Sequence, residues 1–440
     1  SMREAFISHI KSRQLLLPQH PYLLACSGGM DSMALANLLL LAGIPFEIAH
    51  VNFKLRDEES DGDQSFVENW ALKHQITFHL KIADTKHLSL SQGISIQMAA
   101  REIRYAFFEE IRAKFNLEGI LLAHHEDDQL ETIFLNLLRG TGIEGVYGMS
   151  ERKGWLIRPL LPFSRAELTD FMKSGGLEWR EDSSNEKSDY KRNNLRHNGL
   201  PAILSLEADA KKNLLTSFER LKDTGRAFSG LFDFWKARSI VEKDGIQSLK
   251  YTDIVHLPGG ASLLYFWLRS FGFNSDQAQQ IWDSVTDIKP GSVFIGKDFQ
   301  LWMDRTEMML CPKPISFETL LIQGDQHEVN LPEGIYDLSR STKPQAIDLR
   351  LQNALLDLDR LEFPLEIRLW KEGDRFIPLG MQSEKKISDF LIDLKVPAPK
   401  KQEVKVLVSG NKIAWVIGMR IADWAKITPA TRHTIHFKKR

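Results

Sequence analysis

The chain has 440 residues, a length that favours two or three domains of ordinary size. Apolar residues make up 43% of it and charged residues 26%, which excludes a fibrous or a largely disordered protein. No apolar run approaches the roughly 18 residues of a membrane-spanning helix, and no export signal is visible at the start. Cys26 and Cys311 are too few for a disulfide framework. We therefore expect a cytoplasmic protein with no membrane partner.

The charges are unevenly spread. Residues 366–440 contain 16 Lys and Arg against 8 Asp and Glu, a local charge of +8, whereas the whole chain has a net charge of −1. A basic block on an otherwise acidic chain is typical of a surface that binds a polyanion. A solvated lysine-rich face would have the same composition and is the alternative.

Four short apolar runs in the first 200 residues have the length and composition of buried strands. They cover residues 22–26, 46–51, 76–80 and 119–123. Helix-length segments separate them. The segment 95–115 has an apolar stripe at helical spacing, and SRAE at 164–167 matches a capping box that opens another helix. This alternation predicts an α/β fold, a parallel sheet with helices on both faces.

The sequence pattern predicts four parts. Residues 1–204 carry the α/β pattern and form the expected catalytic domain. Over 205–312 Leu, Phe and Trp recur at helical spacing, which predicts a mostly helical middle domain that ends in a hairpin at 291–312. Residues 313–365 are expected to be a linker with short strands, and 366–440 a small mixed α/β domain with a basic surface.

The most specific motif is SGGMDS, residues 27–32, between the first predicted strand and a predicted helix. Adjacent glycines let the main chain approach a ligand, and successive N–H groups at a helix start bind anions. Asp31 in such a cradle requires a cation between its carboxylate and a phosphate, which indicates Mg²⁺. A helix-capping turn without a ligand is the alternative. The motif matches neither GxxxxGK[ST] nor GxGxxG, so a GTPase-type or dinucleotide site is disfavoured.

SGGMDS resembles the PP-loop of the N-type ATP pyrophosphatases, Rossmann-like proteins that cleave ATP between its α and β phosphates. The resemblance implies that ATP is a substrate and Mg²⁺ a cofactor. It also implies that the whole loop binds ATP, through Ser27, Gly28, Gly29, Met30, Asp31 and Ser32.

A second cluster follows the fourth predicted strand, in the string LAHHEDDQLETIFLNLLRGTG at 122–142. Asp127, Asp128 and Glu131 are spaced to share one face of a helix that begins there. Stacked carboxylates suit Mg²⁺ or a substrate ammonium, whereas a zinc site at the paired histidines lacks cysteine partners. An acidic first turn that complements the helix dipole is the alternative. It leaves the RGTG turn at 139–142 unexplained.

This string resembles the HHxDDQxET…RGxG signature of the tRNA(Ile)-lysidine synthetases. Further matches cover residues 93–105, 158–161, 179–185, 192–201 and 373–397. The resemblance is weakest over 205–350. One departure is Phe53, where many members have a histidine, so His50 is the only imidazole of that segment.

The resemblance implies an ATP-dependent ligase. Its substrates are L-lysine and tRNA(Ile) with a CAU anticodon. The C2 oxygen of the wobble cytidine is adenylated with release of pyrophosphate, and the lysine ε-amine then displaces AMP to form lysidine.

The resemblance and the residue chemistry together predict roles for individual side chains. The expected catalytic residues are Asp31, Arg101 and Asp128. Beyond the loop, the expected ATP-binding residues are His50, Arg139 and Gly140. The expected lysine-binding residues are Arg104, Asp128 and Glu131, and the expected metal ligands are Asp31 and Asp127. The expected tRNA contacts are Lys191, Arg192, Asn193 and Arg196, and in the basic domain Arg375, Lys385 and Lys386. Which carboxylate acts as general base stays open.

The nearest alternative is a tRNA 2-thiolation enzyme of the same superfamily. It would need an accessible catalytic thiolate. Cys26 lies in an apolar predicted strand and Cys311 in the predicted hairpin, which disfavours it. A free-nucleotide synthetase would leave the basic domain unused, and a non-catalytic RNA-binding module would leave the carboxylates unused.

Overall fold

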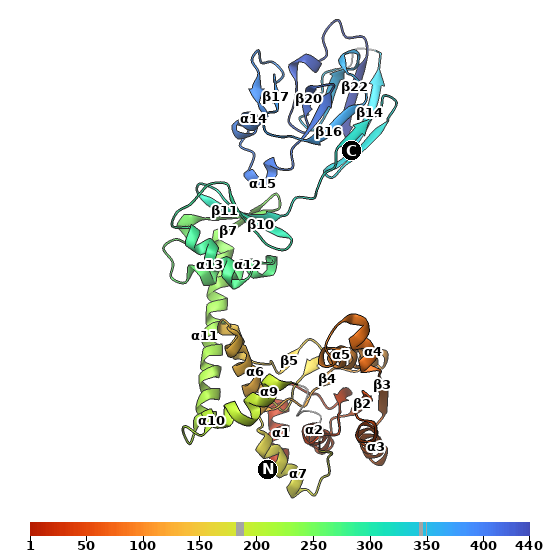
Figure 1. Ribbon diagram of the computed structural model, residues 1–440, viewed down its shortest axis with the longest axis vertical. Coiled ribbons are helices and arrows are strands. Elements are labelled where there is room, and N and C mark those ends of the chain that lie inside the picture. The colour runs from red at the N-terminus through yellow and green to blue at the C-terminus, as the bar shows by residue number, and fades with distance from the viewer. Residues whose placement is uncertain (182–188, 343–345, 349) are drawn as a thin grey trace. The chain divides into compact units, whose positions relative to one another are not determined.

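The chain folds into two compact units, residues 1–229 and 230–440, each with its own hydrophobic cores (Figure 1). The computed structural model describes residues 1–181, 189–342, 346–348 and 350–440. Within these ranges, no helix combines the length and the apolar composition that crossing a membrane requires.

The first unit is built on a six-stranded sheet of order β3-β2-β1-β4-β6-β5. Its strands are β1 (Tyr22–Ala25), β2 (Phe46–Asn52), β3 (Phe78–Ile82), β4 (Ile120–Leu121), β5 (Arg152–Lys153) and β6 (Leu156–Ile157). Neighbouring strands are parallel except β5 and β6. Because β1 lies between β2 and β4, its carboxyl end is the point where ligands bind in open parallel sheets. Each of the four predicted runs overlaps an observed strand.

The helices of this unit begin and end at residues that suit their positions. Gly43 ends α2 with a φ of +69°, the side chain of Ser95 caps α5, and Ser164 forms the predicted capping box of α7 with Glu167. The α-helices are α1 (Met2–Ser12), α2 (Met30–Ala42), α3 (Asp57–Lys73), α4 (Thr85–Gln92), α5 (Ile96–Lys114), α6 (Glu126–Arg139), α7 (Arg165–Ser174), α9 (Tyr190–Asn194), α10 (Leu200–Leu204) and α11 (Ala210–Ser239). The described residues of this unit also form a 3₁₀ helix, η1 (Ile143–Tyr147), and a π-helical turn, η2 (Leu195–Gly199).

Helices cover both faces of this sheet. Leu24 of β1 faces a core that holds Phe6 of α1 and Met33 of α2, whereas Leu23 faces a second core with Phe107 of α5. Successive strand residues point to opposite faces, and helices cover both faces, so both leucines are fully buried. The predicted α/β architecture is confirmed.

Residues 240–312 form a five-stranded antiparallel sheet of order β7-β8-β11-β10-β9 with two helices. Its elements are β7 (Ile240–Lys243), β8 (Ile246–Lys250), η3 (Tyr251–Asp253), α12 (Gly260–Leu268), η4 (Arg269–Phe271), α13 (Ser275–Ser284), β9 (Ser292–Ile295), β10 (Phe299–Met303) and β11 (Glu307–Pro312). The expected helices are present, and the sheet is larger than the expected hairpin. β7 has one half-buried and three exposed residues, so no apolar run marks it in the sequence.

The remaining strands form two antiparallel sheets and a two-stranded ribbon. One sheet holds β12 (Leu320–Ile322), β16 (Leu365–Leu369), β19 (Lys405–Ser409), β20 (Lys412–Val416) and β21 (Arg420–Ile421). The other holds β13 (Glu328–Leu331), β14 (Gly334–Ser341), β22 (Thr434–Lys439) and β15 (Ala354–Asp357). The ribbon is β17 (Arg375–Phe376) with β18 (Lys385–Lys386), and the helices are η5 (Leu358–Arg360), α14 (Ile387–Asp393), α15 (Ala398–Lys401) and η6 (Asp423–Ala425).

The short strands expected at 313–365 are present, but this stretch is part of the C-terminal sheets rather than a linker. β12 pairs with β16, and β14 and β15 both pair with β22, so this stretch supplies four strands of the two C-terminal sheets. The partner strands come later in the chain, and a local sequence pattern cannot reveal such pairing.

Candidate active site

Residues 27–32 form the turn between β1 and α2. Gly28 has a φ of +94°, which residues with a Cβ rarely adopt. The Ser32 hydroxyl accepts a hydrogen bond from the Gly28 amide at 3.2 Å, and the Ser27 hydroxyl accepts one from the Gly29 amide at 3.2 Å. The turn is therefore held by its own hydroxyls, with the first amides of α2 at its mouth.

Asp31, in the first turn of α2, faces the first turn of α6. Its Oδ2 atom lies 3.2 Å from Nε2 of His125, and Oδ2 of Asp128 lies 3.3 Å from the same nitrogen. Asp128 also accepts a hydrogen bond from the His125 amide at 2.9 Å and so caps α6. A buried imidazole thus joins the starts of two helices.

The two neighbouring histidines have opposite electrostatic environments. Burial alone would lower the pKa of His125, but the hydrogen bond to Asp31 and the charges of Asp128, Asp31 and Asp127 outweigh it and raise this pKa. Burial lowers the pKa of His124 to about 4. His125 is therefore suited to carry a proton between carboxylates, whereas His124 is neutral.

The cluster around Asp31 fits a divalent cation. One ligand atom each of Asp31, His125 and Asp128 lies within 4.8 Å of the others. Oδ1 of Asp31 is buried, and within the described part of the chain it has no hydrogen-bond partner. A buried carboxylate oxygen without a donor suits a hard cation such as Mg²⁺.

Asp127, the other predicted metal ligand, has different partners. Its Oδ1 atom accepts a hydrogen bond from Nζ of Lys211 at 2.7 Å and one from the Arg165 amide at 3.3 Å. Burial alone would raise the pKa of Asp127, but these donors outweigh it and lower the pKa. The structure groups Asp128 rather than Asp127 with Asp31, and Asp127 connects α6 to α7 and α11.

Glu131 is almost fully buried, with 2% of its side chain exposed, and is paired with Arg196 of η2. Nε of Arg196 donates to Oε1 of Glu131 at 2.6 Å and Nη2 donates to Oε2 at 3.0 Å. Nη2 also lies 3.8 Å from Oδ1 of Asp128. One guanidinium thus compensates both carboxylates predicted to bind lysine.

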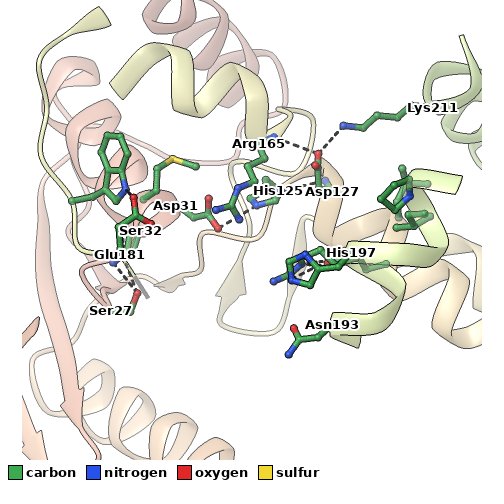
Figure 2. A pocket seen from close by; sticks show the side chains of 18 of the residues that line it. Ser27, Asp31, Ser32, His125, Asp127, Arg165, Glu181, Asn193, His197 and Lys211 are labelled. Atoms are coloured by element: carbon green, nitrogen blue, oxygen red, sulfur yellow. Dashed lines mark hydrogen bonds and ion pairs between the residues drawn. The ribbon is translucent and has the colours of Figure 1, made fainter. Parts of the chain in front are cut away.

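These groups surround one cavity of about 590 Å³ in the first unit. There the turn at residues 27–32, the phosphate-loop turn, and the start of α6 face each other (Figure 2). Gly28 and Asp128 contact residues of its wall. Predicted site residues on the wall are Ser27, Gly29, Met30, Asp31, Ser32, Asp127, Glu131, Asn193 and Arg196.

Sequence reasoning gave no role to three cations of this wall, Arg165, Arg180 and Lys211. Arg165 is the first residue of α7, where a positive charge interacts unfavourably with the helix dipole. An arginine at this position could therefore have indicated a functional role. Lys211 lies near the start of α11 in a stretch without a recognisable motif.

Some predicted ATP-binding residues lie away from this cavity. His50 is buried, its Nδ1 lies 2.8 Å from the Cys26 carbonyl oxygen, and burial lowers its pKa. Arg139 and Gly140 are at the far end of α6, about 20 Å of helix from its first turn at 1.5 Å per residue. The structure therefore places Arg139 and Gly140 far from the phosphate loop, whereas His50 contacts the main chain directly before the loop without lining the cavity.

The two arginines of α5 that were predicted as site residues also lie outside the cavity wall. Arg101 and Arg104 are exposed, with their guanidinium carbons 5.1 Å from the Tyr105 ring centroid and 5.5 Å from that of Phe53. They share the exposed face of α5, as the spacing predicts.

The KRNNLRH segment is divided between two cavities. Asn193 and Arg196 line the first, whereas Lys191 and Arg192 line a second cavity of about 790 Å³ together with Arg139. The wall of the second cavity also includes Tyr190, whose side chain is 82% exposed. Cations and an exposed ring thus share a concave surface.

In the second unit, the predicted tRNA contacts lie on the β17–β18 ribbon. Arg375 pairs in register with Lys386, and both are exposed, so two cations stand side by side. Lys385 is ion-paired with Asp393. Of the motif at 179–185, residues 179–181 line the first cavity, and 182–185 lie outside the described residues.

The turn at the end of β1 and the parallel sheet around it define a PP-loop ATP-binding protein, and the profile of the PP-loop domain matches residues 2–203. Two further profiles match: the TilS substrate binding domain at 242–313 and the TilS substrate C-terminal domain at 365–436.

Relatives cover the whole chain. The tRNA(Ile)-lysidine synthase of Bacteroides thetaiotaomicron is 35% identical over 99% of both chains. That of Parabacteroides distasonis is 33% identical over 97% of both, and that of Geobacter sulfurreducens 30% identical over 94% of this chain and 92% of its own. The chain belongs to the tRNA(Ile)-lysidine synthase family and is an ATP-dependent ligase.

Proposed function

We propose that the chain joins L-lysine to the wobble cytidine of tRNA(Ile) with a CAU anticodon, with cleavage of ATP to AMP and pyrophosphate. One observation carries the proposal: the phosphate-loop turn and the buried carboxylate of α6 open into the same cavity. A nucleotide and an amino acid bound there would lie next to each other.

In the first step the amides of residues 27–32 and the dipole of α2 bind the triphosphate. The cytosine C2 oxygen attacks the α-phosphorus, the bond to the bridging oxygen breaks, and pyrophosphate leaves. The cations Arg165, Arg196 and Lys211 on the cavity wall suit the charge that develops on phosphate oxygens. Mg²⁺ held by Asp31 and Asp128 would supply further charge neutralisation.

In the second step the lysine ε-amine attacks C2 of the adenylated ring. The C2–O bond breaks, and AMP leaves with that oxygen. The attacking amine must first lose a proton, since an ammonium with an ordinary pKa of about 10.4 has no free electron pair. Asp128 and Glu131 are the acids we propose to bind lysine, and Arg196 orients Glu131.

The RNA is proposed to lie against the basic surfaces of both units. Lys191, Arg192 and Arg139 offer phosphate contacts, and the exposed ring of Tyr190 offers a stacking surface for an unpaired base. In the second unit, the cations of the β17–β18 ribbon would contact phosphates elsewhere on the tRNA.

Both cysteines argue against the thiolation alternative. Burial raises the pKa of Cys26 to about 11, and burial also raises the pKa of Cys311. Both thiols are buried and protonated near neutral pH, so neither suits the role of a catalytic thiolate.

The test is incubation with ATP, L-lysine and a tRNA(Ile) transcript with a CAU anticodon, followed by nucleoside mass analysis and nucleotide chromatography. We expect lysidine, AMP and pyrophosphate in equal amounts. Asp31→Asn should lower pyrophosphate release at least about 100-fold, because it removes the charge next to the phosphates. Release of ADP, unmodified RNA, or full activity after the Asp31→Asn substitution would contradict the proposal.

A further inference from the structure

A short segment at 179–181 crosses the phosphate-loop turn, and Arg180 connects the two. The Arg180 amide donates a hydrogen bond to the carbonyl oxygen of Gly28 at 2.8 Å. On one side of this contact Trp179 packs against the core of the first unit, and its Nε1 atom donates to Glu181 at 3.2 Å. Residues 179–181 all line the first cavity.

The side chain of Arg180 makes a second connection, to helix α3. Its Nε atom donates to Oδ1 of Asp63 at 3.0 Å. The guanidinium lies directly over Gly62: a Cβ at that position would overlap with Nη2 and lie 3.1 Å from Cζ. Glycine is among the least favourable residues for a helix interior, so its presence at the sixth position of α3 is explained by the space that Arg180 needs.

The contact to the Gly28 carbonyl fixes an entire peptide group. In a trans peptide the carbonyl and the following N–H point in opposite directions, so a donor on the Gly28 oxygen also sets the direction of the Gly29 N–H. Gly28 has no Cβ to restrict it and has a φ of +94°, so contacts must hold this peptide in place. The Gly29 N–H donates to the Ser27 hydroxyl within the turn at 3.2 Å, so Arg180 and Ser27 hold the two polar groups of the same peptide.

We propose that Arg180 is a positioning residue for ATP: its amide and its guanidinium tie the Gly28–Gly29 peptide to α3 and keep the phosphate-loop turn in the shape that binds the nucleotide phosphates. The inference deepens the proposed function, on which it rests for the identity of the nucleotide. It adds to the site a support formed by Gly62, Asp63 and Arg180.

The test measures ATP binding of three variants, in the absence of RNA and lysine, by intrinsic fluorescence or calorimetry. We expect Arg180→Ala, Asp63→Asn and Gly62→Ala each to weaken ATP binding roughly tenfold, the scale of one lost hydrogen bond to a charged group. Gly62→Ala is the sharpest variant, since alanine favours the helix: its melting temperature should be unchanged or higher although ATP binding is weaker.

Matched controls separate this effect from general damage. Asp61→Asn removes the neighbouring ion pair of α3, between Asp61 and Lys54, and should leave ATP binding unchanged. Gly230→Ala replaces a helical glycine with open space around its Cβ and should do the same. In steady-state assays of the ligation, KM for ATP should rise while KM for lysine stays constant, and Arg180→Lys should recover part of the loss.

Two outcomes would overturn the proposal. Unchanged ATP binding in Gly62→Ala and Asp63→Asn, together with a large loss in Arg180→Ala, would mean that the guanidinium contacts a phosphate directly. Unchanged ATP binding in all three variants would mean that the turn needs no such support. The expected pattern of ATP binding in the variants, together with no lysidine formation by the unsubstituted protein, would instead count against the proposed function.

Discussion

Arg196 and Glu131 form an ion pair whose members differ in exposure. The Glu131 side chain is 2% exposed and that of Arg196 is 31% exposed. A buried carboxylate needs a compensating charge, and here one guanidinium supplies it with two hydrogen bonds. The arginine reaches Glu131 from a π-helical turn, an uncommon geometry that is frequent at functional sites.

Glu131→Gln should raise KM for lysine about tenfold, because one charge that would bind the ammonium is lost. It should also lower the free energy of unfolding by about 1–3 kcal/mol, since Arg196 keeps a weaker partner. Steady-state kinetics and thermal melting measure both effects. Glu126→Gln on the same helix, whose partner is Lys211, is the control for KM. An unchanged KM for lysine would exclude Glu131 from the lysine site.

Spacing along one helix was enough to predict which acids share a face, and it could not predict their partners. Asp127, Asp128 and Glu131 do lie together at the start of α6. Their partners, however, come from other segments: Lys211 from α11 and Arg196 from η2. Arg139 shows a second limit of the sequence pattern. It belongs to the same motif as these acids, but the motif follows α6, so Arg139 at the far end of the helix lines a different cavity.

At the scale of elements, Gly225 allows α11 to pack against η1. A Cβ at Gly225 would overlap with the hydroxyl of Tyr147 and lie 3.0 Å from its Cε1 atom. Glycine normally weakens a helix by about 1 kcal/mol relative to alanine. Here the space that it leaves is occupied by an aromatic ring, so the packing outweighs the propensity.

Gly225→Ala should therefore destabilise the protein by about 1–3 kcal/mol, the usual effect of overpacking. Gly230→Ala, five residues further along the same helix and with open space at its Cβ, should stabilise it by up to about 1 kcal/mol. Urea unfolding of the two variants measures this difference in sign. Equal effects of the two substitutions would show that Tyr147 moves aside freely.

The start of the ribbon in the second unit depends on a half-buried ion pair between Arg368 of β16 and Asp374. Both Nη atoms of Arg368 donate to this carboxylate, at 2.9 and 3.0 Å, and the Lys371 amide donates at 2.8 Å. Burial alone would raise the pKa of Asp374, but these donors outweigh it and lower the pKa.

Because the folded-state pKa of Asp374 is below the unfolded value of about 3.9, its stabilisation is present above that pH and is lost as the pH falls through the folded-state pKa. Asp374→Asn should destabilise the protein by about 1–3 kcal/mol at pH 7, and by progressively less as the pH falls below about 4. Urea unfolding followed by tryptophan fluorescence at several pH values measures this. A destabilisation that does not depend on pH would contradict the assigned pKa direction.

At the scale of the whole molecule, the basic surface of the second unit should control how tRNA affinity depends on salt. Arg375→Gln with Lys386→Gln removes two adjacent exposed cations. The slope of log affinity against log salt should become shallower by about 0.7–0.9 for each phosphate that the ribbon no longer neutralises. The rate at saturating tRNA should stay the same.

Filter binding between low and moderate salt measures this slope, with Lys243→Gln in β7 as the control. An unchanged slope would remove the ribbon from the tRNA surface. Point substitutions are preferable to deletion of 366–440, because that deletion would remove β22, leave β15 without a partner strand, leave β14 with β13 alone and remove nearly all of β16, the partner of β12.

Local patterns predicted the fold of the first unit better than that of the second. Buried parallel strands such as β1 are continuous apolar runs, and helix caps such as Ser164 are readable from a few residues. In the second unit the sheets are antiparallel and their edges are exposed, as in β7. Their strands are defined by distant partners rather than by their own composition, so the pattern predicts a hairpin and a linker with short strands where the chain forms larger sheets.

The position of β22 has a consequence for synthesis of the protein. β22 lies between β14 and β15, so the four-stranded sheet cannot close until the ribosome has completed Lys439. Until then the nascent chain presents two unpaired strand edges, which favour association with other chains. A nonsense or frameshift mutation between codons 358 and 433 would make that exposure permanent, and we expect its product to be found with chaperones or in aggregates.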